Sequence, residues 1–399
     1  MLLPNLTLLL LPVLLSVYCH GGLAFLSAVK PFTAHSHQLF AHDKQRVADG
    51  VPTIDIASLW EEKYSERRKE CINKISEACE AWGFFQISNH QVPQGIIDNM
   101  YDQMRSFFYL PLEEKYTIKR TADNSRGFYD DELTKQTRDW KQRPPAIDLV
   151  LTTRKPPRHQ TSQIARRRWN QWPKEDVLPE FRTAMEVVYL QGQKNVTANL
   201  HSKHIFCAEG VFAPAFEGHS SYLRLNYYPL CPDPGAHLGI NRHTDAGALT
   251  PTINVCLVSA LQVNKDGAWV GVRPAPGTFT INVGDMLQVW SNGKYKAPEH
   301  RVLANPAMER FSAPFFYNPA YAADVAPLPG LLDEKGKEKG RAAPGCDGQS
   351  GPASQYAPVN WGHFRLRRFQ GDFADVGTEI QIADFLLPGA LAAAGDNNY

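Results

Sequence analysis

The sequence lacks an excess of charge of either sign. Its 42 lysine and arginine residues almost balance 41 aspartate and glutamate residues, which leaves a net charge of +1 at pH 7. Proteins that bind nucleic acid usually carry a strongly basic surface, so the composition gives no reason to expect a nucleic-acid partner. The short basic runs Arg154-Lys155 and Arg166–Arg168 are more typical of a solvated loop than of a site for an anionic surface.

Long hydrophobic runs are also missing. The apolar stretch at residues 6–18 is interrupted by Pro12 and is too short for the roughly 20 residues of a transmembrane helix. We therefore expect no stable membrane span in the mature chain. The stretch is typical of a signal-peptide core instead, because the small residues of Gly22–Ala24 follow it. Against this, Met1–Asn5 contains no lysine or arginine.

The first 49 residues are therefore interpreted as leader sequence. Residues 1–24 are the possible signal peptide, and residues 25–49 are a flexible or transit-like segment in which basic residues outnumber acidic ones. We expect entry into the secretory pathway, or into an organelle reached through it. A cytoplasmic location is the alternative.

Paired cysteines are absent as well. The sequence has seven cysteines, of which Cys19 falls in the leader, and the other six show neither paired spacing nor a zinc motif. Cys71 and Cys79 fit the interior of a helix, so buried thiols are the favoured interpretation.

What the sequence does contain is a set of periodic segments that alternate between helix and strand in its first half. Apolar residues at steps of three and four predict three helices, and short apolar runs bounded by turn residues predict strands. The predicted helices are one around Ile72–Trp82 that ends at Gly83, one around Ile96–Phe107 and one from Leu178 to about Glu209; the predicted strands are Val51–Ile56 and Phe84–Ile87.

The second half is dominated by short strand-like runs separated by Gly, Pro and Asn. Examples between residues 211 and 320 are Phe279–Val283, Met286–Trp290 and Phe315–Tyr317. This pattern indicates a sandwich or jelly roll rather than a parallel sheet. Residues 331–357 mix charges with Gly, Pro and Ser and predict a mobile surface insertion.

Candidate metal ligands lie in the stretch Gly239–Asp245. His243 and Asp245 are two residues apart, and His300 follows far downstream. Two histidines and one carboxylate can occupy one face of an Fe(II) ion and leave the opposite positions open. On an extended strand residues i and i+2 point to the same side, so His243 and Asp245 could bind one ion. A solvated loop or a hydrogen-bonded pair is the alternative for the tripeptide alone.

Two pairs of polar residues with the same i, i+2 spacing flank this stretch. Asn226 and Tyr228 share one face of a predicted strand, and Arg310 and Ser312 share one face of another. Arginine binds a carboxylate through two parallel hydrogen bonds, and serine adds a third donor. A metal site with a carboxylate clamp suggests a keto-acid cosubstrate.

These motifs together carry a resemblance to a known family. The sequence resembles the 2-oxoglutarate and Fe(II)-dependent dioxygenase superfamily, in particular its isopenicillin N synthase-like branch, over about residues 50–385. The matching stretches, in the family's order, are Arg224–Pro229, His243–Thr250, Leu261–Val263, Ile281–Gln288, Ser291–Lys296, His300–Val302 and Arg310–Ser312.

The resemblance implies an α+β fold with a double-stranded β-helix (jelly-roll) core and flanking N-terminal helices. It implies an N-terminal dioxygenase region at residues 50–175, the core at 176–330, the insertion at 331–357, and a C-terminal helix and tail at 358–399. Substrate specificity is expected around Arg126–Phe128 and Trp140–Lys141 and in residues 150–175.

The resemblance also implies the chemistry. His243, Asp245 and His300 would bind Fe(II), while Arg310 and Ser312 would hold the distal carboxylate of 2-oxoglutarate. Asn226 and Tyr228 would be further hydrogen-bond partners of that carboxylate. With O2, a monomeric enzyme of this kind would hydroxylate, desaturate or cyclise a small organic substrate and release succinate and CO2. The alternatives are an Fe(II) oxidase or cyclase of the same family that does not use 2-oxoglutarate, and a non-catalytic binding protein on this scaffold.

One further acidic residue lies within the matching stretches. Asp285 follows Gly284, and we expect it to be a turn residue or a support for the ligands rather than a ligand.

Overall fold

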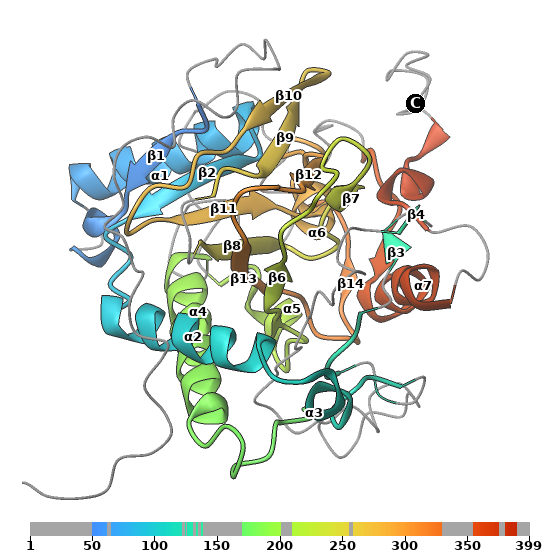
Figure 1. The fold of residues 1–399 in the computed structure, drawn as a ribbon. Coiled ribbons are helices and arrows are strands. Elements are labelled where there is room, and N and C mark those ends of the chain that lie inside the picture. Colours follow the sequence, from blue (N-terminus) through green and yellow to red (C-terminus); the bar gives the residue numbers. More distant parts are fainter. Residues whose placement is uncertain are drawn as a thin grey trace, which may run out of the picture. The chain divides into compact units, whose positions relative to one another are not determined.

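The computed structural model in Figure 1 describes residues 50–61, 65–121, 124, 126–130, 133–134, 137–138, 170–200, 210–254, 258–328, 354–374 and 380–388. The predicted leader segments at 1–24 and 25–49 lie outside these ranges. So do residues 331–353 of the predicted insertion and most of the region in which substrate specificity is expected.

Two antiparallel sheets form the core. The larger has the order β1-β2-β11-β8-β13-β5, with β6 also paired to β13, and the smaller has the order β10-β9-β12-β7. The single parallel pair within them is β1 with β2. The strands of the larger sheet are β1 (Thr53–Asp55), β2 (Phe84–Ser88), β5 (Tyr222–Leu223), β6 (Asn226–Tyr228), β8 (Leu249–Asn254), β11 (Phe279–Val283) and β13 (Arg310–Phe316). Those of the smaller sheet are β7 (Leu238–His243), β9 (Leu261–Lys265), β10 (Ala268–Gly271) and β12 (His300–Leu303).

Helices accompany these sheets, and two small ribbons complete the described part of the chain. The ribbons pair β3 (Leu133–Thr134) with β4 (Thr137–Arg138), and β14 (Asp324–Val325) with β15 (Val359–Asn360). The α-helices are α1 (Glu66–Ala81), α2 (Gln94–Phe108), α3 (Leu112–Tyr116), α4 (Phe181–Leu200), α5 (Ala213–Phe216), α6 (Asp285–Trp290) and α7 (Trp361–Ala374). Short 3₁₀ helices span η2 (Ala57–Trp60) and η4 (Ile382–Phe385).

The predicted α+β fold with a jelly-roll core and N-terminal helices is confirmed. The predicted helix before Gly83 is α1, which begins after Ser65, whose hydroxyl oxygen accepts a hydrogen bond from the Arg68 N–H. Gly83 follows with φ +63°, a left-handed conformation that glycine adopts without strain. Among the described helices, none is both long and apolar enough to cross a lipid bilayer.

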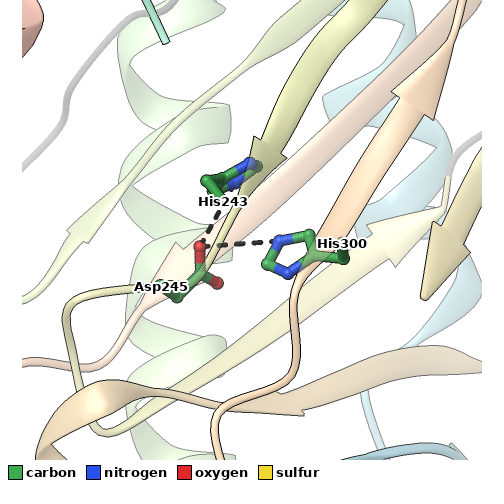
Figure 2. Close-up of side chains that lie close together, drawn as sticks. All are labelled: His243, Asp245 and His300. Carbon is green, nitrogen blue, oxygen red and sulfur yellow. Dashed lines mark ion pairs between the residues drawn. The ribbon is translucent and has the colours of Figure 1, made fainter. Parts of the chain in front are cut away.

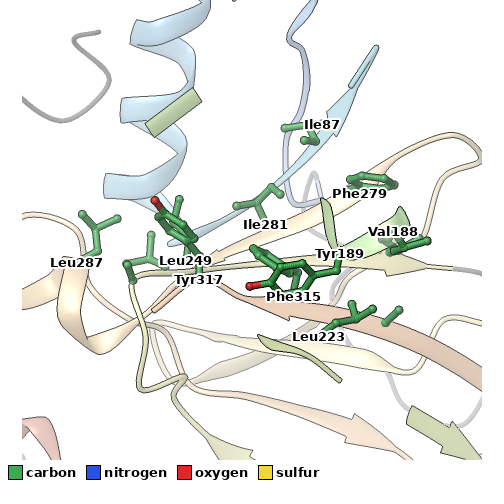
Figure 3. Close-up of a cluster of buried hydrophobic side chains, with 14 of the residues drawn as sticks. Ile87, Val188, Tyr189, Leu223, Leu249, Phe279, Ile281, Leu287, Phe315 and Tyr317 are labelled. Atoms are coloured by element: carbon green, nitrogen blue, oxygen red, sulfur yellow. The ribbon is translucent and has the colours of Figure 1, made fainter. Parts of the chain in front are cut away.

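The main hydrophobic core lies between the helices and the larger sheet. Figure 3 shows Val188 and Tyr189 of α4 near Leu223 and Phe315 of the sheet. The rings of Tyr189 and Phe315 meet edge to face, with their centres 5.3 Å apart. Burying side chains of this size contributes about 1.5–3 kcal/mol each. Because Phe315 belongs to β13, this packing also fixes the strand that carries Arg310 and Ser312.

One predicted strand is wrong. Met286–Trp290 was expected to be extended, because it is a short apolar run between turn residues and includes the strand-favouring Val289 and Trp290; it lies in helix α6 instead. All residues of α6 except Gln288 are buried. The burial of the segment as a helix therefore outweighs the local preference of its residues for a strand.

The last residues of the predicted insertion are packed against the rest of the described chain. The insertion was predicted to end at residue 357, but residues 354–357 are described and make defined contacts. Tyr356 is buried, and its hydroxyl accepts a hydrogen bond of 2.8 Å from the Gln288 amide. The Gln355 backbone N–H donates to the Asn292 side chain at 2.7 Å.

Candidate active site

Two histidines lie opposite each other on neighbouring strands of the smaller sheet. His243 ends β7, His300 begins β12, and the antiparallel register places the two directly opposite. Their ring centres are 4.3 Å apart. Figure 2 shows Asp245 below this pair, with its Oδ1 atom 3.6 Å from Nε2 of each histidine. One atom from each of the three residues lies within 4.8 Å of the other two, close enough for one metal ion.

The three predicted ligands are therefore brought together, but not by the geometry that was expected. The strand ends at His243, so Asp245 lies in the following turn rather than on the same strand face. Helix α6 holds this turn. Its first N–H groups, which have no acceptor within the helix, donate from Asp285 to the Asp245 carbonyl at 2.8 Å and from Met286 to the Gly247 carbonyl at 2.9 Å. Asp285 thus supports a candidate ligand through its backbone, as predicted, and is not part of the cluster.

Backbone carbonyls determine which nitrogen of each histidine is available to a metal. Nδ1 of His243 lies 2.8 Å from the Asn241 carbonyl oxygen, and Nδ1 of His300 lies 3.2 Å from the Pro298 carbonyl oxygen. A carbonyl oxygen only accepts hydrogen bonds, so Nδ1 must carry the hydrogen in both rings. In the neutral imidazole the lone pair is then on Nε2, which is the atom that faces Asp245. This is the tautomer that a metal ligand requires.

Asp245 is a buried carboxylate that is held in its charged form. The Asn282 side-chain amide donates a hydrogen bond of 2.7 Å to its Oδ2 atom. Burial by itself raises the pKa of Asp245, but the positive charge that His300 and His243 carry when they are protonated, together with the Asn282 hydrogen bond, outweighs this effect and lowers the pKa below its ordinary value. The cluster therefore offers one carboxylate and two neutral nitrogens, a donor set that suits Fe(II) and leaves coordination positions open.

The four predicted carboxylate-binding residues also lie together. Strand β13 pairs with β6 so that Arg310 is opposite Tyr228 and Ser312 is opposite Asn226. All four side chains are buried. The Ser312 hydroxyl oxygen accepts from Arg310 Nη1 at 3.3 Å and from Asn226 Nδ2 at 3.4 Å. Because that oxygen accepts both bonds, its own hydrogen remains free to be donated to a ligand.

The charge of Arg310 is the feature that most needs a ligand. Its side chain is 4% exposed, and it forms no ion pair with any acidic residue in the described part of the chain. The Tyr228 ring, whose centre is 5.0 Å from the guanidinium carbon, offsets only part of the lost hydration. A buried, unpaired guanidinium costs several kcal/mol. The distal carboxylate of 2-oxoglutarate would remove this cost, so these residues fit the cosubstrate.

Comparison with known proteins identifies the family. Residues 219–319 match the 2OG-Fe(II) oxygenase superfamily, and residues 51–175 match the N-terminal region of non-haem dioxygenases described from morphine synthesis. Jasmonate-induced oxygenase 2 of Arabidopsis thaliana is 35% identical over 298 residues, which cover 71% of this chain and 74% of that protein. The chain belongs to the 2OG-Fe(II) oxygenase superfamily.

Other relatives agree with this assignment. The present chain is 35% identical over 290 residues to oxoglutarate-dependent flavonoid 7-O-demethylase 1 of Ocimum basilicum. The match covers 71% of this chain and 72% of that protein. The crystal structure of JOX2 in complex with 2OG, Fe and JA superposes with a TM-score of 0.61 at 28% identity and covers 81% of this chain and 86% of that one. Neurospora crassa T7H, at 21% identity and a TM-score of 0.62, shares the fold.

Membership of the family establishes the class of this protein. The protein is an enzyme, its metal is Fe(II) and its cosubstrate is 2-oxoglutarate. The two alternatives considered from the sequence, an oxidase that does not use 2-oxoglutarate and a non-catalytic binding protein, are therefore set aside.

One residue of the site was missed by the sequence analysis. Asn282 lies in the predicted strand Phe279–Val283, all of whose residues are buried. A polar residue at an inward position of such a strand needs a hydrogen-bond partner. This was the available signal, and the structure shows that the partner is Asp245.

Proposed function

We propose that this oxygenase hydroxylates a C–H bond of a small organic substrate, with His243, Asp245 and His300 as the iron ligands. Arg310 and Ser312 bind the distal carboxylate of 2-oxoglutarate, and Asn226 and Tyr228 complete that pocket. The observation that carries the proposal is the combination of the buried His-Asp-His cluster with a buried guanidinium that has no acidic partner among the described residues.

The residues of this chain bind and orient, and the cofactors supply the reactivity. With O2, Fe(II) and 2-oxoglutarate supply the oxidation of an unactivated C–H bond, with release of succinate and CO2. Asp245 contributes a negative charge that neutralises part of the metal's charge, and the carbonyls of Asn241 and Pro298 hold the imidazoles in the ligating tautomer. Arg310, by binding the distal carboxylate, would orient the cosubstrate in the site.

Hydroxylation is favoured over desaturation and cyclisation because the relatives include several O-demethylases. Among them are oxoglutarate-dependent flavonoid 7-O-demethylase 1 of Ocimum basilicum and thebaine 6-O-demethylase of Papaver somniferum. Removing an O-methyl group by oxidation begins with hydroxylation of the methyl carbon. Jasmonates, flavonoid ethers and alkaloid ethers are therefore the compounds to screen first, by their stimulation of succinate formation.

The metal assignment is tested by anaerobic titration with Fe(II) and then with 2-oxoglutarate, followed by admission of oxygen. In the wild type we expect iron binding, a weak visible charge-transfer band and, with oxygen, succinate. His243→Ala should bind no iron, whereas His237→Ala, which changes an exposed histidine just before β7, should behave like the wild type. Full iron binding by His243→Ala would contradict the assignment.

We also propose that residues 1–24 direct the protein into the secretory pathway or an organelle reached through it. The support is the apolar run at residues 6–18 followed by small residues at 22–24. Microscopy of a fluorescent fusion is the test, and a diffuse cytosolic signal would contradict the proposal.

A further inference from the structure

The C-terminal helix reaches the metal cluster through a buried arginine. Arg368 of α7 is 6% exposed, and its Nη2 atom donates a hydrogen bond of 3.0 Å to the Thr244 carbonyl oxygen. Thr244 stands between His243 and Asp245, two of the three proposed iron ligands. Arg368 therefore binds the segment of backbone from which both ligands project, although it belongs to a helix far away in the sequence.

This hydrogen bond acts on the peptide unit that begins Asp245. The Thr244 carbonyl and the Asp245 N–H belong to one planar peptide, so fixing the carbonyl fixes the orientation of the Asp245 backbone. The peptide that follows is fixed from the other side, because the Asp285 N–H donates to the Asp245 carbonyl at 2.8 Å. Asp245 lies beyond the end of β7 and has no strand pairing of its own. These two bonds therefore fix the backbone of Asp245, while the Asn282 amide holds its carboxylate directly.

Arg368 is itself held firmly. Its Nη1 atom donates to the Gln381 side-chain oxygen at 2.9 Å, and it lies 3.5 Å from the Ile380 carbonyl oxygen. The start of α7 is fixed by Trp361, which is fully buried and donates from Nε1 to the Ser220 hydroxyl at 2.8 Å. Hydrogen bonds from a charged guanidinium are roughly twice as strong as neutral ones. The arginine thus links the metal cluster to both α7 and the segment around η4.

We propose that Arg368 is a positioning residue for the metal centre, which sets the metal affinity by fixing the backbone that carries Asp245. This inference rests on the proposed function, since it takes Asp245 as an iron ligand. Groups that orient metal ligands by hydrogen bonds, without contacting the metal, typically weaken metal binding by about 10- to 100-fold when they are removed. We expect a loss in that range for Arg368→Gln, which cannot reach Thr244 and Gln381 together.

The neighbouring Arg367 supplies a matched control. It lies on the same helix but is exposed, so Arg367→Gln makes the same chemical change without touching the Thr244 carbonyl. Arg368→Lys keeps the charge but offers one nitrogen instead of a fork. It should bind metal more weakly than the wild type and more tightly than Arg368→Gln.

The experiment is a titration of the full-length apoprotein with Mn(II), followed by electron paramagnetic resonance, and with Co(II), followed by visible absorption, both without 2-oxoglutarate. Arg368→Gln should weaken Mn(II) binding about 10- to 100-fold and change the Co(II) spectrum, because the carboxylate is displaced. Arg367→Gln should match the wild type in both. A role confined to overall stability would lower the melting temperature and leave the dissociation constant and the spectrum of the folded protein unchanged.

The outcomes separate the two proposals. If the wild type binds neither metal, the proposed function fails; if it binds and Arg368→Gln binds equally well with the same spectrum, the positioning role fails. Should Arg368→Gln not fold, Gln381→Leu replaces it, since this change removes one acceptor that holds the guanidinium. Gln381→Leu should then weaken Mn(II) binding in the same direction, and unchanged affinity would overturn the inference.

Discussion

Replacing Arg310 by methionine should show whether this buried charge stabilises the fold or binds the cosubstrate. In a protein whose arginine pairs with an internal acid, the change would leave that acid unpaired and cost about 3–5 kcal/mol of folding stability. Arg310 has no such acid among the described residues. The variant loses a 3.3 Å hydrogen bond to Ser312 and the contact with the Tyr228 ring, together about 1–3 kcal/mol. The variant also avoids the free-energy cost of burying the guanidinium, which is as large as this loss or larger.

The stability of Arg310→Met without cosubstrate should therefore equal or exceed that of the wild type, while 2-oxoglutarate binding collapses. Losing the charged partner of a buried carboxylate costs about 2–5 kcal/mol. At 1.4 kcal/mol per tenfold change in affinity, the dissociation constant should rise by a factor of about 30 to several thousand. Arg273→Met, at an exposed arginine, is the control and should change neither quantity.

Urea unfolding of the apoprotein and anaerobic calorimetry with Mn(II) in place of iron measure the two quantities. A second keto acid sharpens the test. 2-Oxopentanoate lacks the distal carboxylate, so the wild type should prefer 2-oxoglutarate strongly and Arg310→Met should discriminate little between the two. Retained preference for 2-oxoglutarate, or a loss of more than about 3 kcal/mol in apoprotein stability, would refute the reasoning.

Three further predictions concern the surroundings of the cluster. Asn282→Ala removes the hydrogen bond that helps to keep the pKa of Asp245 low, so metal affinity should fall about 10- to 100-fold and the acid limb of metal binding should move to higher pH. A pH series of Mn(II) titrations checks both. Gly284→Ala would place a methyl group 2.9 Å from the Asp245 carbonyl oxygen, which should destabilise the protein by about 1–3 kcal/mol in urea unfolding; Gly271→Ala, with open space around it, should not. Burial raises the pKa of the Cys79 thiol, so alkylation followed by mass spectrometry should find it unmodified until the protein unfolds.

The sequence was informative where a local pattern and a tertiary environment agree. Helix α1 was predicted from its periodic apolar residues and from Gly83, and the proximity of Ser312 to Arg310 was predicted from their i, i+2 spacing on a strand. The roles of Asn226 and Tyr228 beside them came from the family resemblance. The meeting of His243 with His300 followed from the family resemblance. It could not be derived from spacing, because the register of β12 against β7 depends on contacts across the whole smaller sheet.

The sequence was uninformative or misleading where a tertiary contact decides. Residues 286–290 satisfy a strand pattern, yet they form a helix whose free N–H groups hold the Asp245 turn. Arg368 looked like one of several basic residues on a helix near the C-terminus. Its role depends on a carbonyl that is remote in the sequence, and nothing in the local composition around Arg368 indicates it.

The cross-strand pairing of His243 and His300 has a consequence for engineering this chain. The pairing is set by strand register in the smaller sheet, so a loop between the two histidines can change in length where it leaves the paired strands and the contacts of Asp245 unaltered. The Asp266-Gly267 turn, with both residues at positive φ, joins β9 to β10 just outside the residues of β9 that pair with β12, the last of which is Val263. An epitope or reporter domain inserted in that turn should leave metal binding intact. A single residue inserted into β12 would direct His300 to the opposite face of the sheet.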